Sequence, residues 1–300
     1  MMKPKLLAVS HQVDAVVQKN PAEPLVDQTR ARLIEPPRRW EALELGEFWR
    51  YRELLYFLTW RDVKVRYKQT AIGAAWAILQ PFLTMVVFSV IFGGLMQVPS
   101  DGVPYPVFSY AALLPWNFFA GALNRSGNSL VYDANLISKV YFPRLILPLS
   151  AVLSLILDFG VAFVVLLVMM LFYGIVPGIA VVTLPLFLLL AFMTALACGI
   201  WLSAVNVKYR DVAYAIPFLT QFWLFVTPVA YPSTIIPERW RLLYSLNPMA
   251  GVVEGFRWAL LGQQNLSWDL LLVSIIVVTT LLISGLFYFR RTEHEFADVV

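Results

Sequence analysis

The longest stretch of this sequence without a charged side chain covers 49 residues, from Phe159 to Val207. A helix that crosses the hydrocarbon of a bilayer needs about 20 consecutive apolar residues. The stretch is therefore long enough for two crossings, and the glycines and proline of residues 174–178 mark a turn between them. A second uncharged stretch covers the 32 residues 69–100, and hydrophobic residues make up 59% of the 300 residues. The sequence therefore predicts a polytopic membrane protein.

The remaining apolar segments complete an all-α protein with six transmembrane helices. Each apolar segment between two polar loops corresponds to one crossing of the membrane. We expect the spans at about residues 72–96, 107–131, 145–173, 180–205, 213–231 and 270–289.

Residues 45–68, which precede the first span, combine many aromatic side chains with basic ones. This composition is typical of an amphipathic helix in the membrane interface, where its basic end meets anionic lipids. A soluble helix packed on the protein itself is the alternative. Residues 1–44 are polar and contain five prolines, which predicts a flexible cytoplasmic tail. The transmembrane domain is expected over residues 69–291, followed by a second tail over residues 292–300.

The segment between the fifth and sixth spans, residues 232–269, is too apolar for a free loop and too interrupted for a span. Non-helical backbone at membrane depth must be covered by protein or line a wet cavity. We therefore expect two short re-entrant helices that dip into the outer leaflet. Gly251 and Gly255 are four residues apart, which is expected to allow close helix packing.

Lysine and arginine are distributed unevenly over the loops. With six spans, 19 of the 23 basic residues fall on one side and three on the other, and Arg125 lies within the second span. Cytoplasmic loops carry the excess of basic residues. The sequence therefore predicts that both termini and the polar loops 132–148 and 205–211 are cytoplasmic. The re-entrant segment is then on the outside.

Residues that carry out catalysis or bind metals are scarce. Cys198 is the only cysteine, and the two histidines, His11 and His294, lie near opposite ends of the chain, so we expect no metal site. No GxxxxGK[ST] motif occurs, so we expect no bound ATP, no other cofactor and no enzymatic activity in this chain. The net charge of +4 does not indicate nucleic-acid binding, because basic residues set the orientation of a membrane protein.

The loop between the second and third spans, Tyr132–Pro148, is short and carries Asp133, Lys139 and Arg144. It has no histidine, no cysteine and no paired acids, so it cannot carry out chemistry by itself. We interpret it as a cytoplasmic site at which another protein binds and exerts force on the membrane domain.

Four blocks of the sequence resemble the permease subunit of ABC-2 type exporters. More narrowly, they resemble the members that export lipid-linked polysaccharide such as O-antigen, capsule or teichoic acid. The resemblance covers about Leu45 to Arg291. The blocks are RDVKVRYKQTAIGAAWAILQPF (61–82), LLPWNFF (113–119), NLISKVYFPR (135–144) and SLNPMAGVVEGFRWALLG (245–262).

The resemblance implies a homodimeric permease in the bacterial inner (plasma) membrane, which exports a polyprenyl-linked glycan. Two copies of a separate ABC ATPase subunit would bind ATP and Mg²⁺ and drive the export. The loop between the second and third spans would carry the coupling helix that enters a cleft on the ATPase. The residues of that helix would be Asn135, Leu136, Ile137, Ser138, Lys139, Val140 and Tyr141.

The resemblance also implies an export pathway lined by aromatic side chains, because sugar rings stack on aromatic faces. The alternative is that most of these rings are packing or interface residues, since Trp and Tyr collect at membrane interfaces. The candidates are Trp116, Phe118, Phe119, Trp223, Phe225 and Tyr231.

Two charged residues of the broken outer segment, Glu254 and Arg257, are expected at or near hydrocarbon depth, where charges are costly. They lie three residues apart on one short helix, so they could pair with each other. The alternative is that they hold the re-entrant helices as an outer gate.

Two further charges are expected within spans: Arg125 in the second and Asp158 in the third. They could pair and lock the two helices together, which is the interpretation we favour. Alternatively, Arg125 faces the cytoplasmic entrance and binds the lipid pyrophosphate of the substrate. Arg61, Arg66 and Lys68 are better placed for these phosphates, or they simply contact anionic lipids.

Two other functions remain open at this point. An exporter of the same type could carry a drug or a small lipid. An ion-coupled secondary transporter could use Asp158 as its proton carrier, although such carriers often show two related halves, and no repeat is apparent here.

Overall fold

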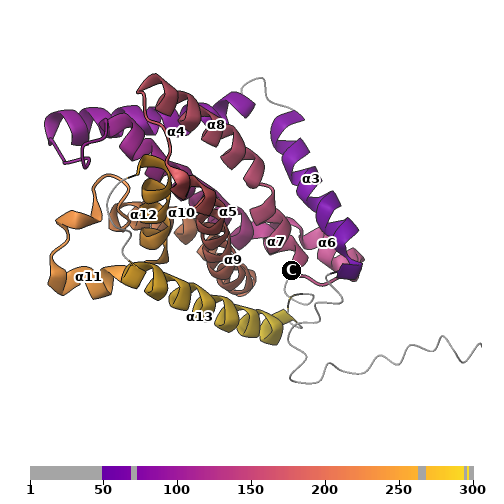
Figure 1. The fold of residues 1–300 in the computed structure, drawn as a ribbon. Coiled ribbons are helices and arrows are strands. Elements are labelled where there is room, and N and C mark those ends of the chain that lie inside the picture. The colour runs from indigo at the N-terminus through magenta and orange to yellow at the C-terminus, as the bar shows by residue number, and fades with distance from the viewer. Residues whose placement is uncertain (1–48, 69–72, 263–267, 294–295, 297–300) are drawn as a thin grey trace, which may run out of the picture. The chain divides into compact units, whose positions relative to one another are not determined.

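The computed structural model describes residues 49–68, 73–262, 268–293 and 296, which all belong to one compact unit of residues 42–300. Every regular element in these ranges is a helix (Figure 1). The tail expected over residues 1–44 lies outside the described residues, as does most of the tail over 292–300. In chain order the elements are α3 (Arg52–Lys68), α4 (Gly73–Phe88), η2 (Ser89–Leu95), α5 (Tyr105–Tyr132), α6 (Ala134–Lys139), α7 (Ile146–Leu153), α8 (Ile156–Phe172), η3 (Ile179–Thr183), α9 (Leu184–Lys208), α10 (Val212–Val226), η4 (Ser233–Ile235), α11 (Glu238–Ser245), α12 (Pro248–Leu261) and α13 (Trp268–Thr292).

Four helical stretches are long and apolar enough to cross a membrane: Ala75–Leu95, Ile146–Phe172, Ile179–Lys208 and Trp268–Thr292. They coincide with the first, third, fourth and sixth expected spans. The second expected span corresponds to α5, which has 28 residues but carries several polar side chains. The fifth corresponds to α10, which is apolar but has only 15 residues.

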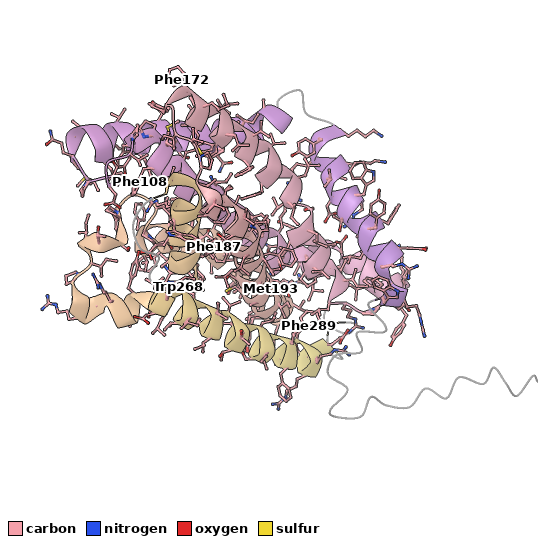
Figure 2. The ribbon with its side chains drawn as sticks, viewed as in Figure 1. Phe108, Phe172, Phe187, Met193, Trp268 and Phe289 are labelled. Carbon is pink, nitrogen blue, oxygen red and sulfur yellow. The ribbon has the colours of Figure 1, made fainter. Side chains whose placement is uncertain are left out.

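The polar side chains of α5 are explained by its position, because α5 packs against α4, α7, α8, α9, α10 and α12. Its polar groups therefore meet other helices instead of lipid. The amide nitrogen of Asn206 on α9 donates to Asn128 Oδ1 and to the carbonyl of Gly127, both at 3.0 Å. The enclosing helices have buried and exposed apolar side chains: Phe187 on α9 is buried, whereas Phe172 on α8 is 84% exposed (Figure 2).

The two short helices expected between the last two spans are present as α11 and α12. The two glycines of α12 confirm the prediction of close packing. A Cβ atom at Gly255 would lie 2.1 Å from the ring of Phe187, and one at Gly251 would lie 2.5 Å from Ser274 Oγ. Only glycine therefore allows α12 to approach α9 and α13 this closely.

The segment expected as an interface helix forms α3, which packs against α7. Leu58 and Val63 are its buried side chains, while Tyr56 and Phe57 are 70% and 65% exposed. α3 therefore has one side on the protein and an aromatic side that faces outward, and its place in a membrane interface stays a prediction.

Candidate functional site

The loop between α5 and α7 contains a single short helix, α6, with one anchored side and one exposed side. Ile137 and Phe142 are only 7% and 4% exposed and belong to a small core shared with α3, α7, α9 and α13. Val140 and Tyr141 are 52% and 89% exposed. The other exposed members of the expected coupling helix are Asn135, Ser138 and Lys139, whereas Leu136 is half-buried.

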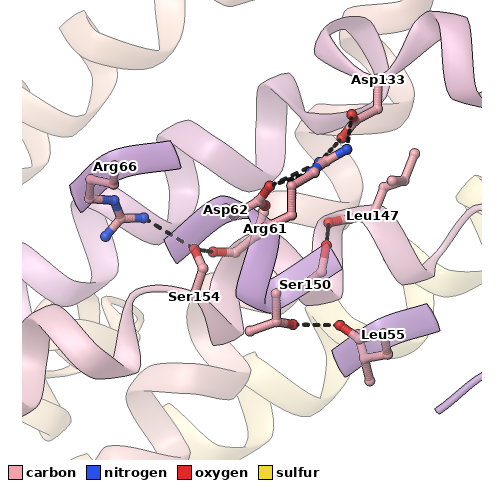
Figure 3. Close-up of polar contacts among 10 residues, drawn as sticks. Leu55, Arg61, Asp62, Arg66, Asp133, Leu147, Ser150 and Ser154 are labelled. Atoms are coloured by element: carbon pink, nitrogen blue, oxygen red, sulfur yellow. Dashed lines mark hydrogen bonds and ion pairs between the residues drawn. The ribbon is translucent and has the colours of Figure 1, made fainter. Parts of the chain in front are cut away.

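The beginning of α6 is bound to α3 by a two-pronged ion pair (Figure 3). Arg61 donates from Nη1 to Asp133 Oδ1 at 2.8 Å and from Nη2 to Asp133 Oδ2 at 2.9 Å. The same guanidinium also binds the carboxylate of Asp62, its chain neighbour. The bond with Asp133 raises the pKa of Arg61 above its ordinary value, although burial opposes the shift. Arg61, expected as a phosphate ligand, is thus already engaged by two carboxylates.

The other end of the loop is held by the residues that follow α13. The backbone N–H of Arg144 donates to Glu293 Oε1 at 3.3 Å, and its guanidinium donates to the carbonyl of Glu293. The same guanidinium lies 6.0 Å from the ring centre of Phe296, which is buried edge-on against Phe289. Sequence analysis missed this contact, because Glu293 and Arg144 are 149 residues apart and no local pattern connects them.

The expected pairing of Arg125 with Asp158 is wrong. Asp158 forms an ion pair with Arg66 and accepts a hydrogen bond from the hydroxyl of Tyr67, and both partners belong to α3. No ion pair joins Arg125 to Asp158 in the described part of the chain. The sequence argument compared only the two spans and did not include α3 as a source of partners.

Arg66 also donates to Ser154 Oγ at 3.2 Å (Figure 3). Burial, together with the nearby positive charge of Arg125, lowers the pKa of Arg66 to about 10. Arg66 thus remains a cation at neutral pH, and the charge of Arg125 is near enough to affect it. Lys68 is exposed at the end of α3.

The aromatic side chains expected along a pathway are mostly packed on one another. On α5, Trp116, Phe118 and Phe119 are at most 4% exposed. The ring of Phe119 lies 5.1 Å from that of Trp223 on α10, and the ring of Phe118 lies 5.9 Å from that of Phe159. Within a single chain these rings form core contacts. Tyr231 is half-buried and donates to the carbonyl of Phe225, whose ring is 59% exposed.

Of the two alternatives for Glu254 and Arg257, the ion pair is not formed among the described residues, because Arg257 binds backbone carbonyls instead. Its guanidinium donates to the carbonyls of Pro228 and Val229, each at 2.7 Å. It also donates to those of Tyr231 at 3.2 Å and Phe108 at 3.3 Å. Arg257 is 5% exposed and lies 3.6 Å from the ring centre of Phe108.

The chain after α10 explains this arrangement. Residues 227–231 are not helical, so their carbonyls need donors from elsewhere, and buried backbone groups are rarely left unpaired. An arginine offers five N–H groups in a fixed plane. The side chain of Arg257 on α12 therefore supplies hydrogen-bond donors to several carbonyls of this irregular segment. The expected role of Glu254 and Arg257 as an outer gate stays a prediction.

Asn247 fastens the same region, and sequence analysis did not assign it a role. Its Oδ1 caps α12 by accepting from the backbone N–H of Met249 at 3.1 Å, and it accepts from Trp223 Nε1 at 2.9 Å. Its amide nitrogen donates to Thr227 Oγ1 at 3.0 Å. The signal was present in the sequence, because asparagine followed by proline is a common start of a helix.

Among the described residues, no group of three or more His, Cys, Asp and Glu side chains could hold a metal ion. His11 and His294 lie outside these residues.

Comparisons with known proteins agree with this architecture. Residues 53–261 match the family described as ABC-2 type transporter. The chain is 32% identical over 260 residues to the O-antigen export system permease protein RfbA of Myxococcus xanthus, covering 85% of this chain and 98% of that protein. It is 28% identical to the Klebsiella pneumoniae protein of the same name, over 83% of this chain and 95% of the relative. It is 25% identical to the polysialic acid transport protein KpsM of Escherichia coli, over 78% and 91% of the two chains.

Proposed function

Because the chain belongs to the ABC-2 type transporter family, we propose that it is the permease subunit of an exporter of lipid-linked polysaccharide. The relatives named for O-antigen export and for polysialic acid transport support this substrate class. The chain has no phosphate-binding motif of its own, so in this proposal a separate ATPase subunit supplies the energy, and an ion gradient is the alternative. Two copies of each subunit would form the exporter in the inner membrane.

In this proposal α4 with η2, α5, α7 with α8, η3 with α9, α10 and α13 are the six spans. Both termini and α6 are cytoplasmic, α3 lies in the interface, and α11 and α12 re-enter the outer leaflet. The four apolar stretches support four of the spans. The enclosure of α5 among six other helices explains how a more polar helix could be a further span.

The observation that supports the proposal is the way in which the loop that carries α6 is attached to other parts of the chain. The exposed side of this loop, with Lys139 and Tyr141, is available to a partner. The loop that carries α6 is bound to α3 through Asp133 at its start, and to Glu293, which follows α13, through Arg144 at its end. A force that a partner applies to α6 therefore reaches two other helices directly. This is the arrangement that an ATPase needs in order to move a membrane domain.

Arg66, Arg125 and Lys68 would form the cytoplasmic entrance for the phosphates of the substrate. Arg66 and Arg125 are close enough for one charge to lower the pKa of the other, and phosphate would relieve this repulsion. A phosphate would have to compete with Asp158 for Arg66. Arg61 binds two carboxylates, so it contributes to the attachment of the α6 loop instead.

Purification of the tagged chain in a mild detergent tests the function. We expect an ATPase subunit to co-purify in an equal amount and to be lost when residues 138–141 are scrambled. Scrambling residues 175–178, in the turn between α8 and η3, is the matched control and should leave the ATPase bound. Equal recovery of the ATPase with both variants would overturn the role of α6.

A deletion of the chain in its own cells tests the substrate class. We expect the polysaccharide to accumulate inside the cell and to disappear from the surface, as detected with glycan-specific staining. Unchanged surface glycan, together with the loss of a drug-efflux or lipid-export phenotype, would favour the alternative cargo.

A further inference from the structure

The described unit contains a cavity of about 370 Å³ where α4, α5 and α8 meet. This volume lies in the range of about 300–1,000 Å³ that is usual for small-molecule sites. Four polar side chains line it at the depth of the proposed spans: Gln80, Asn117, Asn124 and Asp158. Polar side chains at such depth are expensive and usually face a wet cavity or a ligand.

One polar side chain of the lining has no hydrogen-bond partner, and one helical turn of the lining lacks a backbone donor. The side-chain nitrogen of Asn117 is buried and forms no hydrogen bond within the described residues. Pro81 has no N–H, so the carbonyl of Ala77, one turn earlier on α4, receives no helical hydrogen bond from it. Ala77 and Pro81 both line the cavity. An unpaired amide and a helical turn that lacks one hydrogen bond thus belong to residues of the lining.

The rest of the lining is apolar and includes the rings of Phe118 and Phe159. A pyranose ring has the complementary surface, because hydroxyl groups around its edge both donate and accept while its faces carry C–H groups. A lipid tail would leave the amides unpaired. A phosphate would meet Asp158, which is the only ionisable side chain of the lining.

The cationic groups lie beside the cavity and not in its lining. Arg66, which pairs with Asp158, belongs to α3, and Arg125 follows the lining residue Asn124 on α5. A substrate with a phosphate next to its first sugar could therefore place the phosphate near these arginines and the sugar near the amides of the cavity.

We propose that the cavity between α4, α5 and α8 is a binding site for a neutral sugar ring of the exported glycan. The inference rests on the proposed function, because it assumes that the cargo is a polysaccharide. Asn117, Asn124 and Gln80 bind the hydroxyl groups of the ring, and Phe118 and Phe159 contact its faces.

Photo-crosslinking in cells that make the glycan tests the site directly. A benzoylphenylalanine replaces Gln80, which is exposed and lines the cavity, and the control carries it at Val87 on the same helix, which is 50% exposed and outside the lining. After irradiation and denaturing purification, we expect glycan staining of the chain labelled at position 80 and none at position 87. Equal staining of both variants, or no staining at position 80 while export continues, would overturn the site.

A second pair of variants covers the case in which the photo-crosslinker at position 80 blocks export. Asn117→Leu removes the unpaired amide without adding charge. We expect export to fall by about tenfold, because the site would lose one hydrogen bond to a polar group of the substrate. The control is Thr279→Leu on the exposed side of α13. Membrane level and co-purification of the ATPase should stay normal in both. Normal export by Asn117→Leu would contradict the site, while loss of the ATPase from the wild-type chain would contradict the proposed function instead.

Discussion

Two arginines, Arg61 and Arg257, each fasten a non-spanning part of the chain, but they bind different kinds of partner. Arg61 binds the carboxylate of Asp133 at the start of the α6 loop, and the side chain of Arg61 is 33% exposed. Arg257 binds four backbone carbonyls around the segment between α10 and α12, and it is 5% exposed. The first contact joins two side chains, and the second joins a side chain to the main chain.

This difference indicates which contact contributes more to folding. An ion pair that is partly exposed contributes little to the free energy of unfolding. Carbonyls buried around Arg257 have no water to replace it, so that contact has to persist. We therefore expect substitutions in the outer segment to affect folding and substitutions at the α6 loop to affect coupling.

Arg257→Leu is expected to have the largest effect on stability. It leaves several buried carbonyls without donors, which costs at least about 3 kcal/mol. The measurement is the fraction of monodisperse chain after detergent extraction, together with its melting temperature. Arg257→Lys is the matched variant and should be intermediate, because an ammonium group cannot reach four carbonyls at once. A wild-type melting temperature for Arg257→Leu would remove the distinction between the two regions.

Gly255→Ala is expected to come next. Its Cβ would lie 2.1 Å from the ring of Phe187, so α9 and α12 would have to separate, at a cost of about 1–3 kcal/mol. Gly160→Ala on α8 is the control, because a Cβ there would have nothing within 4 Å. The control should melt at or slightly above the wild-type temperature, since alanine favours a helix. Equal melting of the two variants would show that the packing of α12 adjusts.

Thr227→Val should cost about 1 kcal/mol. It keeps the shape of the side chain but removes the hydroxyl that accepts from Asn247 and donates to the carbonyl of Trp223. Thr279→Val on the exposed side of α13 is the control, and the comparison of their melting temperatures measures the effect. No difference would mean that Asn247 holds the outer segment through its bonds with Trp223, Met249 and the carbonyl of Val226.

Asp133→Arg should have the smallest effect on stability, below about 1 kcal/mol, and a large effect on coupling. We expect ATP hydrolysis by the complex to continue while export falls, because α6 would lose its connection to α3. The exchange variant, Arg61→Asp combined with Asp133→Arg, restores opposite charges and should recover part of the export. Failure of the exchange to recover any export would indicate that the two residues act separately.

Much of the helix pattern follows from the sequence. The spans assigned to residues 72–96, 145–173, 180–205 and 270–289 correspond to apolar helices, because uncharged stretches of this length have few other structures. The two short helices between the last spans and the close approach at Gly251 and Gly255 also follow from proline and glycine positions.

The two charge pairings were not predictable from spacing. Pairing of Glu254 with Arg257 relied on a rule for exposed helix faces, and it ignored the carbonyls of residues 228–231, which compete for the same guanidinium. Pairing of Arg125 with Asp158 considered only charges within the two spans. Asp158 instead binds Arg66, 92 residues away and outside the spans. Both errors arise because contacts distant in sequence determine which buried charges meet.

The attachment of the α6 loop at both ends has a mechanical consequence. A beam that is supported at one end bends under a load, whereas a beam supported at both ends passes the load to its supports. Asp133 and Arg144 are the two supports, and they rest on helices from opposite ends of the described chain. A displacement of α6 would therefore be shared between α3 and α13 with little lost to bending, and the stiffness of the loop would come from its attachments more than from its own six-residue helix.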